Sequence, residues 1–141
     1  MTTLRRGGCA CGQLRFEAEG EPIRVGLCHC LTCRKASGSI VNAYAVFPGD
    51  RLRVTGEVRR WTADTPGADA RGHCPTCGGQ VLAGYPGGEV EIRLGALDET
   101  SSLAPTHELF VGRREDWFAC ARPLLAYARG RDGATAVEPP R

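Results

Sequence analysis

The sequence has few of the residues that mark nucleic-acid-binding proteins. Aromatic residues make up 6% of its 141 residues, and Lys35 is the single lysine. Eighteen basic residues are interspersed with sixteen acidic ones, which gives a formal net charge of +2 at pH 7. Nucleic-acid binders carry clustered positive charge, and single-strand binders add aromatic stacking platforms. We therefore expect no nucleic-acid partner.

Long apolar runs are also missing. No stretch approaches the roughly 20 apolar residues that a membrane-spanning helix needs. The segment Met1–Gly8 lacks the apolar region of a secretory signal. We expect no membrane association and a cytoplasmic protein. In that compartment thiols stay reduced, so clustered cysteines bind metal or carry out redox chemistry more often than they form disulfides.

Cysteine, by contrast, is abundant, and its arrangement favours metal binding. Seven of the eight cysteines form two pairs and one triplet: Cys9 and Cys11, Cys74 and Cys77, and Cys28, Cys30 and Cys33. Four thiolates are enough to close a tetrahedral site, whereas three leave one position open. Structural zinc sites are closed by four ligands, and catalytic sites keep a position for water or substrate. The sequence therefore predicts two zinc ions per chain, one structural and one catalytic.

The pairing of the groups has two solutions. In the favoured one the two pairs share an ion and join the N-terminal region to the middle of the chain, while the triplet holds the second ion. In the alternative, Cys9 and Cys11 combine with two cysteines of the triplet, which leaves Cys74 and Cys77 without partners. Cys120 stands alone, and we interpret it as a small buried apolar residue rather than a fourth ligand of the triplet.

Spacing indicates how the sulfurs converge. In a strand, residues i and i+2 point to the same face, so Cys9 can share an ion with Cys11, and Cys28 with Cys30. By the same rule the side chain of His29 points away from the ion. We expect His29 to be a packed or hydrogen-bonded residue, a group that supports the ligands from behind, or a substrate contact. The run Cys74-Pro-Thr-Cys77-Gly-Gly is typical of a zinc knuckle, in which glycine permits positive φ and backbone N–H groups bond the sulfurs.

The remaining pattern predicts a mainly β domain of short antiparallel strands with little helix. Nineteen glycines and nine prolines indicate many turns, and short alternating segments are typical of strands. We expect strands at 14–18, 23–27, 40–47, 52–54, 58–61, 80–83, 90–94 and 107–111, with a hairpin at 52–61. Helix is expected at 34–37 and 122–129, and a mobile loop at 63–71. Trp61 and Trp117 are assigned to the core, residues 1–129 to one domain and 130–141 to a flexible tail.

Four segments of the sequence resemble the glutathione-dependent formaldehyde-activating enzyme family, which includes the centromere protein V domain. They are Gly7-Gly-Cys-Ala-Cys-Gly-Gln-Leu-Arg-Phe16, Cys28-His-Cys-Leu-Thr-Cys-Arg-Lys-Ala-Ser-Gly-Ser39, His73-Cys-Pro-Thr-Cys-Gly78 and Leu94-Gly-Ala-Leu-Asp98; Pro105-Thr-His107 and Trp117 also fit. The resemblance spans about residues 7 to 120. It implies a zinc-bound β-tent fold with a closed site from the two pairs and an open site from the triplet. His73 departs from the family, where an aromatic residue is usual, and Gly79 stands where a small hydroxyl residue is common.

The resemblance also implies a reaction. The family joins formaldehyde to the thiol of glutathione, which is a reversible carbon–sulfur lyase reaction giving S-(hydroxymethyl)glutathione. A thiol that coordinates zinc is deprotonated, so we hypothesise that zinc held by Cys28, Cys30 and Cys33 binds the substrate sulfur. Arg34 and Lys35 either offset the charge of this site, hold a substrate carboxylate, or are solvated surface charges. His107 is a candidate general acid or base, or a structural residue.

Two other functions fit the same cysteines. Both zinc ions can be structural in a non-catalytic binding module, or the triplet can act as a zinc–thiolate redox sensor that loses metal on oxidation. The thiol substrate can also be a low-molecular-weight thiol other than glutathione. The sequence gives no indication of the oligomeric state.

Overall fold

The computed structural model describes residues 2–119 and 124–131. Within these ranges the chain forms eleven β-strands, one α-helix and three short 3-10 helices, which confirms a mainly β fold with little helix. None of the described helices has the length and apolar character needed to cross a membrane. Residues 1–24 and 45–103 form one compact unit, and residues 25–44 with the described part of 104–141 form a second. Each unit is described by itself below.

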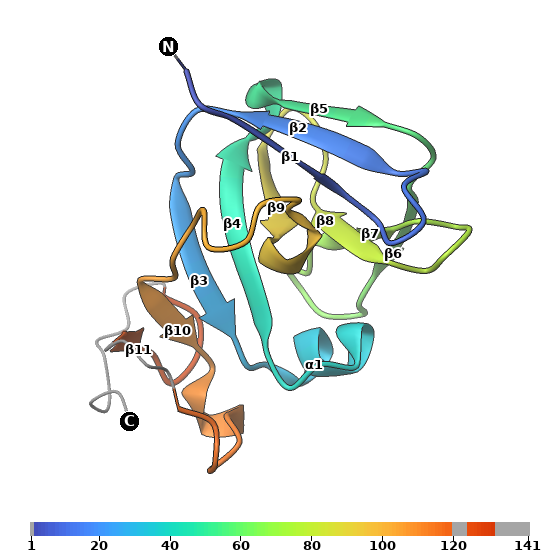
Figure 1. Ribbon diagram of the computed structural model, residues 1–141. Helices are drawn as coiled ribbons and strands as arrows, with labels where there is room; N and C mark the ends of the chain where they lie inside the picture. Colours follow the sequence, from blue (N-terminus) through green and yellow to red (C-terminus); the bar gives the residue numbers. More distant parts are fainter. Residues whose placement is uncertain (1, 120–123, 132–141) are drawn as a thin grey trace. The chain divides into compact units, whose positions relative to one another are not determined.

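The first unit contains a three-stranded antiparallel sheet. Its strands are β1 (Leu4–Gly8), β2 (Arg15–Glu19) and β5 (Leu52–Thr55), with β2 in the middle (Figure 1). Gly7 of β1 pairs with Phe16 of β2. A Cβ atom at Gly7 would lie 2.2 Å from the carbonyl oxygen of Ala96 and 2.5 Å from the Phe16 ring. Sequence patterning missed β1, because its pair of glycines lowers strand propensity although the close packing requires them.

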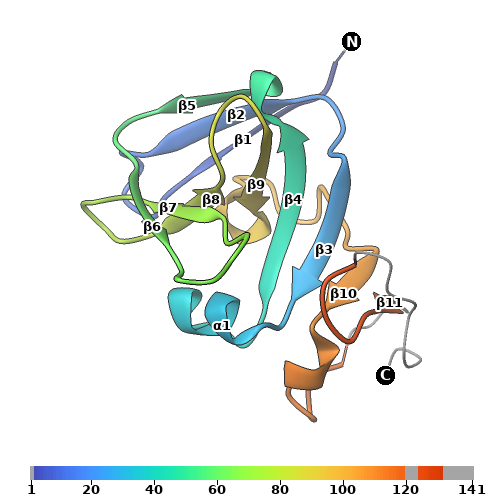
Figure 2. The same cartoon turned by 180° about the vertical axis from the view of Figure 1, so that it is seen from behind.

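The same unit contains an antiparallel run of four further strands. In hydrogen-bonded order they are β9 (Glu89–Arg93), β8 (Gln80–Ala83), β7 (Ala70–His73) and β6 (Arg59–Thr62) (Figure 2). The 3-10 helices η1 (Gly49–Arg51) and η2 (Leu94–Ala96) follow β4 (Asn42–Pro48) and β9. Strand β7 begins at Ala70, inside the segment predicted to be a loop. Buried apolar side chains form the core: Leu14, Phe16, Phe47, Val81, Leu82, Val90 and Ile92.

The predicted hairpin at 52–61 is wrong. Strand β5 pairs with β2, and β6 pairs with β7, so the two segments belong to different sheets. The connection passes through Gly56 at φ 101°, where a Cβ atom would lie 2.1 Å from the carbonyl oxygen of Gln13. Turn residues between two strands therefore do not establish that those strands pair.

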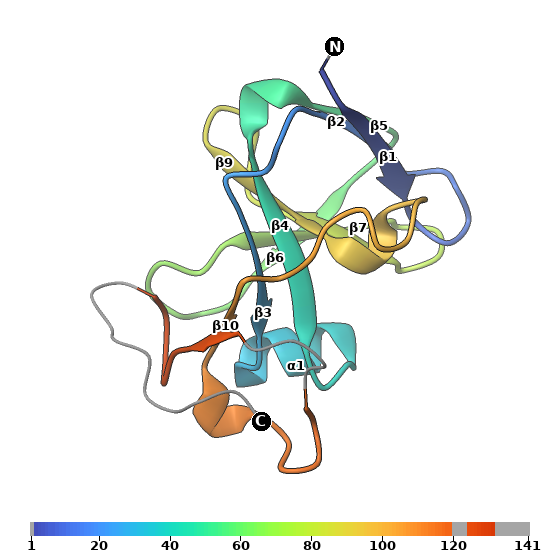
Figure 3. The same cartoon turned by 60° about the vertical axis from the view of Figure 1, so that its left-hand side comes forward.

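The second unit is built on β3 (Arg24–Cys28), whose residues from Val25 onward belong to it. Strand β10 (His107–Leu109) runs parallel to β3, and β11 (Leu125–Ala126) runs parallel to β10. The helix α1 (Leu31–Ser37) follows β3, and η3 (Val111–Arg113) follows β10 (Figure 3). Strand β4 (Asn42–Pro48) begins in this unit and ends in the first one. The parallel pairs differ from the expectation of antiparallel strands alone.

Three further predictions, on the helix at 122–129, the two tryptophans and the C-terminal tail, can be compared with the structure. The described part of 122–129 contains β11 and a bend instead of helix. Both tryptophans are wrongly assigned to the core, since Trp61 is 52% exposed and Trp117 72% exposed. Trp61 lies on β6, at the end of its run of strands, and Trp117 lies in a turn after η3. The predicted tail falls almost entirely outside the described residues.

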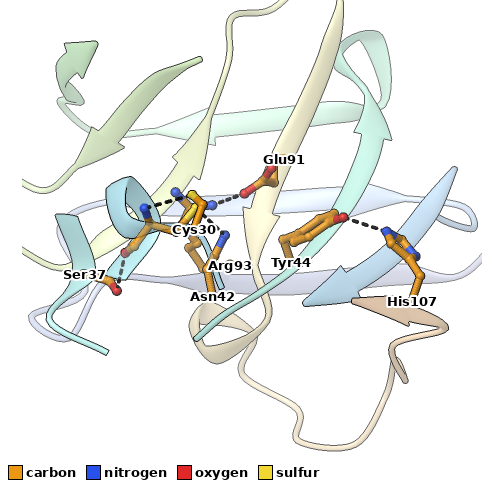
Figure 4. A network of polar contacts seen from close by, with 8 residues as sticks. Cys30, Ser37, Asn42, Tyr44, Glu91, Arg93 and His107 are labelled. Carbon is orange, nitrogen blue, oxygen red and sulfur yellow. Dashed lines mark hydrogen bonds and ion pairs between the residues drawn. The ribbon is translucent and has the colours of Figure 1, made fainter. Parts of the chain in front are cut away.

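A buried polar pair crosses β3 at Gly26. The Tyr44 hydroxyl lies 2.7 Å from Nε2 of His107, and Figure 4 shows the two side chains pointing at each other. A Cβ atom at Gly26 would lie 2.4 Å from that nitrogen and 2.7 Å from the hydroxyl oxygen. The absence of a side chain at this position is therefore what gives the pair its space.

We predict that Gly26→Ala destabilises the protein by about 1–3 kcal/mol, because the new methyl group overpacks a buried site. Gly95→Ala is the control, since no atom lies within 4 Å of a Cβ at that position, and it should change stability by less than about 0.5 kcal/mol. Urea unfolding followed by circular dichroism compares the two. Equal effects of both substitutions would contradict the packing argument.

Candidate metal centres

The first candidate centre brings together four sulfurs from two turns. Cys9 and Cys11 lie in the turn between β1 and β2, and Cys74 and Cys77 lie in the turn between β7 and β8. The sulfur of Cys11 is 3.6 Å from that of Cys9 and 3.7 Å from that of Cys74. All four sulfurs lie within 4.8 Å of one another. The favoured grouping of the two pairs is thus the one that the fold brings about.

Both turns are closed by backbone hydrogen bonds that involve glycine. The N–H of Gly12 donates to the carbonyl of Cys9 at 3.1 Å, and the N–H of Gly78 donates to the carbonyl of Cys74 at 2.9 Å. Both glycines have positive φ, 82° and 74°, which a side chain would disfavour. Cys9 and Cys11 converge through this turn, whereas the spacing argument attributed their convergence to strand alternation.

Backbone amides point at the sulfurs. Leu14 donates to Cys9 at 3.3 Å, Thr76 to Cys74 at 3.4 Å and Gly79 to Cys77 at 3.4 Å. The hydroxyl of Thr76 also donates to the side-chain carbonyl of Gln13 at 2.8 Å and links the two turns. Amide–sulfur hydrogen bonds favour the thiolate form over the thiol.

The neighbouring thiols of the first cluster shift each other's pKa values in opposite directions. The amide of Leu14 lowers the pKa of Cys9 to about 6. The amide of Gln13 lowers the pKa of Cys11, but desolvation and the neighbouring sulfurs outweigh it and raise that pKa to about 11. Four thiolates therefore need a cation between them. A tetrahedral zinc ion with Zn–S bonds of about 2.3 Å places its sulfurs about 3.8 Å apart, close to the separations found here, so the four residues fit the metal.

The second candidate centre is the triplet. Cys28 is the last residue of β3, Cys30 is the N-cap of α1 and Cys33 lies within α1. Their three sulfurs lie within 4.8 Å of one another, with Cys28 and Cys33 buried and Cys30 half-buried. Crowding by the sulfurs of Cys30 and Cys33 raises the pKa of Cys28 far above its usual value. A cation relieves this repulsion, so the triplet also fits a metal ion.

Two donors face the sulfurs of the triplet. The N–H of Cys33 donates to the sulfur of Cys30 at 3.3 Å, and the side-chain amide of Asn42 lies 4.0 Å from the sulfur of Cys33. Sequence reasoning did not single out Asn42. The sequence feature that could have identified it is its position as a lone amide near the start of the apolar segment 40–47. Asn42 is buried in the structure.

His29 does not join the sulfur cluster, as the spacing predicted. Its ring is fully buried, and its Nε2 lies 2.9 Å from a carboxylate oxygen of Glu108. Burial lowers the pKa of His29, and the contact with Glu108 offsets only part of that shift. The ring is therefore neutral at pH 7, with the proton on Nε2 if Glu108 is the ionised acceptor.

The other residues that the sequence analysis singled out do not belong to either sulfur cluster among the described residues. Arg34 donates to the carbonyl of Arg113 at 2.7 Å and pairs with Glu115, so its guanidinium is held by the protein. Lys35 is exposed on α1.

His107 contacts Tyr44, and its role as general acid or base stays a prediction. His73 is half-buried at the end of β7, and Cys120 lies outside the described residues.

Comparison with known proteins agrees with the cysteine pattern. The sequence model of the glutathione-dependent formaldehyde-activating enzyme family matches residues 4–113. The chain belongs to this family, and the matched region contains all seven clustered cysteines. No curated protein matches the chain significantly.

One similar solved structure is the crystal structure of a Rhodobacter sphaeroides protein. It has a TM-score of 0.52 and 23% sequence identity, and the match covers 69% of this chain and 91% of that one. At this identity the similarity supports the fold alone.

We predict that Cys74→Ser removes one metal ion and strongly destabilises the protein, because the binding energy of a structural zinc is folding energy. Thr76→Val lies in the same turn and keeps all four sulfurs. It should cost only the hydrogen bond to Gln13, about 0.5–1.5 kcal/mol. Zinc content by atomic absorption and thermal unfolding by circular dichroism test both variants. Full metal content in Cys74→Ser would exclude the four-sulfur site.

Proposed function

We propose that this protein is a zinc-dependent carbon–sulfur lyase of the S-(hydroxymethyl)glutathione synthase type. Cys9, Cys11, Cys74 and Cys77 hold a structural zinc, and Cys28, Cys30 and Cys33 hold a catalytic one. The observation that carries the proposal is the contrast between four convergent sulfurs and three. A tetrahedral ion bound by the triplet keeps one coordination position for an external ligand.

The chemistry of the triplet suits a thiol substrate. A zinc ion held by Cys28, Cys30 and Cys33 would supply a position that favours the thiolate form of a substrate thiol. In the forward direction the substrate sulfur forms a bond to the aldehyde carbon, the carbon–oxygen π electrons move to oxygen, and that oxygen takes up a proton. The proton lost by the thiol balances the one gained, so no oxidant or reductant is needed. The reverse reaction breaks the carbon–sulfur bond.

The residues around the triplet support this assignment in different ways. Cys30 is more exposed than Cys28 and Cys33, so we propose that the substrate approaches on its side. Because Arg34 is held by Glu115 and a carbonyl group, Lys35 is the better candidate on α1 for a substrate carboxylate.

We predict that Cys30→Ser abolishes turnover, leaves one zinc per chain and preserves the fold, because the four-sulfur cluster is intact in this variant. The exchange between formaldehyde, glutathione and their adduct is measured by NMR above the uncatalysed rate, with circular dichroism as the test of folding. Activity retained at the wild-type level would remove the triplet from the mechanism.

A second prediction concerns the open position itself. Native mass spectrometry of the wild-type protein should show two zinc ions, and added glutathione should give a thiol adduct that keeps both. S-methylglutathione is the matched control, because its sulfur cannot become a thiolate, and it should give no adduct. Two zinc ions with no adduct of any thiol would instead favour a non-catalytic binding module.

A further inference from the structure

Residues of β10 and of the segment after η3 contact His29, which lies between two cysteines of the triplet. The backbone N–H of His29 donates to the carbonyl of Leu109 at 3.0 Å, and Leu109 pairs with Cys28 in the parallel ladder of β3 and β10. The ring of Phe118 contacts the His29 ring edge-on, with centroids 5.4 Å apart. Leu109 and Phe118 therefore contact the residue that stands between Cys28 and Cys30, one at its backbone and the other at its ring.

The polar centre of this contact is a buried row of three side chains. One oxygen of Glu108 lies 2.9 Å from Nε2 of His29, and the other accepts a hydrogen bond from Arg114 at 3.1 Å. The side chains of His29, Glu108 and Arg114 are 0%, 2% and 2% exposed. A buried carboxylate is costly unless it is paired and hydrogen-bonded, and here both of its oxygens are used.

The backbone is shaped to bring Arg114 to this place. Phe110 has φ 55° and ψ 45°, a left-handed conformation that non-glycine residues rarely adopt. It precedes the single turn η3, which returns the chain so that Arg114 meets Glu108. Strain of this kind persists where surrounding contacts over-determine the conformation.

We propose that Glu108 is a positioning residue for the triplet: through His29 it fixes the backbone between Cys28 and Cys30 so that three sulfurs face one ion. The inference rests on the proposed zinc site of the triplet and goes beyond it. Nδ1 of His29 has no hydrogen-bond partner within the described residues, so the contact with Glu108 orients the ring. Outer-shell groups that orient metal ligands typically change metal affinity or activity 10–100-fold when mutated.

Charge and donor number explain why a carboxylate is required. The ionised carboxylate accepts from His29 and from Arg114 at once. An amide at this position has one acceptor oxygen and one donor group, so Glu108→Gln can keep Arg114 on its oxygen only by turning its NH2 group toward Nε2 of His29. That arrangement removes the negative charge beside Arg114 and moves the ring proton to the buried Nδ1, which has no acceptor among the described residues. Asp98→Asn is the matched control, because Asp98 also pairs with an arginine, Arg15, at an exposed site in the first unit.

The experiment measures zinc affinity rather than turnover. Full-length wild type, Glu108→Gln and Asp98→Asn are titrated with a chromophoric zinc chelator, and the cysteines left unprotected are identified by alkylation and peptide mass spectrometry. We expect Glu108→Gln to bind the triplet zinc 10–100-fold more weakly, with alkylation increased over the wild type at Cys28, Cys30 and Cys33 and unchanged at the other cysteines. Asp98→Asn should match the wild type.

A second pair of variants separates positioning from folding. His29→Leu removes the donor but leaves Glu108 paired with Arg114, whereas His29→Gln keeps a donor to the carboxylate. We expect His29→Leu to lose triplet affinity as Glu108→Gln does, and His29→Gln to recover most of it. Wild-type affinity in His29→Leu, or equal loss of zinc from both clusters in Glu108→Gln and His29→Leu, would overturn the inference. A wild-type protein that binds no zinc at the triplet would instead overturn the proposed function.

Discussion

Repulsion between crowded thiolates is the constraint on which this structure depends. Four sulfurs of the first unit lie within 4.8 Å of one another, as do the three of the triplet. Such clusters cannot carry full negative charge together without a cation, as the opposite pKa shifts of Cys9 and Cys11 indicate. A bound ion would therefore stabilise the turns that bring the sulfurs together, and a 141-residue chain with a small core would benefit from such cross-links.

The two clusters are built by different local means. The four-sulfur cluster comes from two glycine turns, in which Gly12 and Gly78 adopt positive φ and amides of Leu14, Thr76 and Gly79 point at sulfur. The triplet comes from the end of a strand followed at once by a short helix, with Cys30 at the helix cap. The first arrangement surrounds an ion with protein ligands, whereas the second presents three ligands from one short segment. This difference accounts for the proposed division between a structural and a catalytic metal.

Much of the fold and of the candidate site could be predicted from short-range pattern. The segments 14–18, 23–27 and 90–94 alternate in polarity and are strands within one residue of the prediction at each end. The knuckle geometry at Cys74 and Cys77 followed from residue type, because only glycine enters the left-handed region without cost. The sequence-based predictions failed where strand pairing or burial depends on a segment that is distant in the sequence. Residues 52–54 and 58–61 flank a turn yet pair with β2 and β7, and Trp61 is exposed because its strand lies at the end of its run.

The sequence by itself therefore determined the family, the mainly β class and the division of seven cysteines into two pairs and a triplet, since ligand type and spacing are local properties of the chain. Only the tertiary structure decided that the two pairs meet and which residues lie behind the ligands of the triplet. Glu108 and Arg114 are far from His29 in sequence, and no local pattern marks them as its partners. The parallel pairing of β10 with β3 and the left-handed turn at Phe110 bring them together. Burial then makes their mutual contacts obligatory, because a charged group removed from water must be paired within the protein.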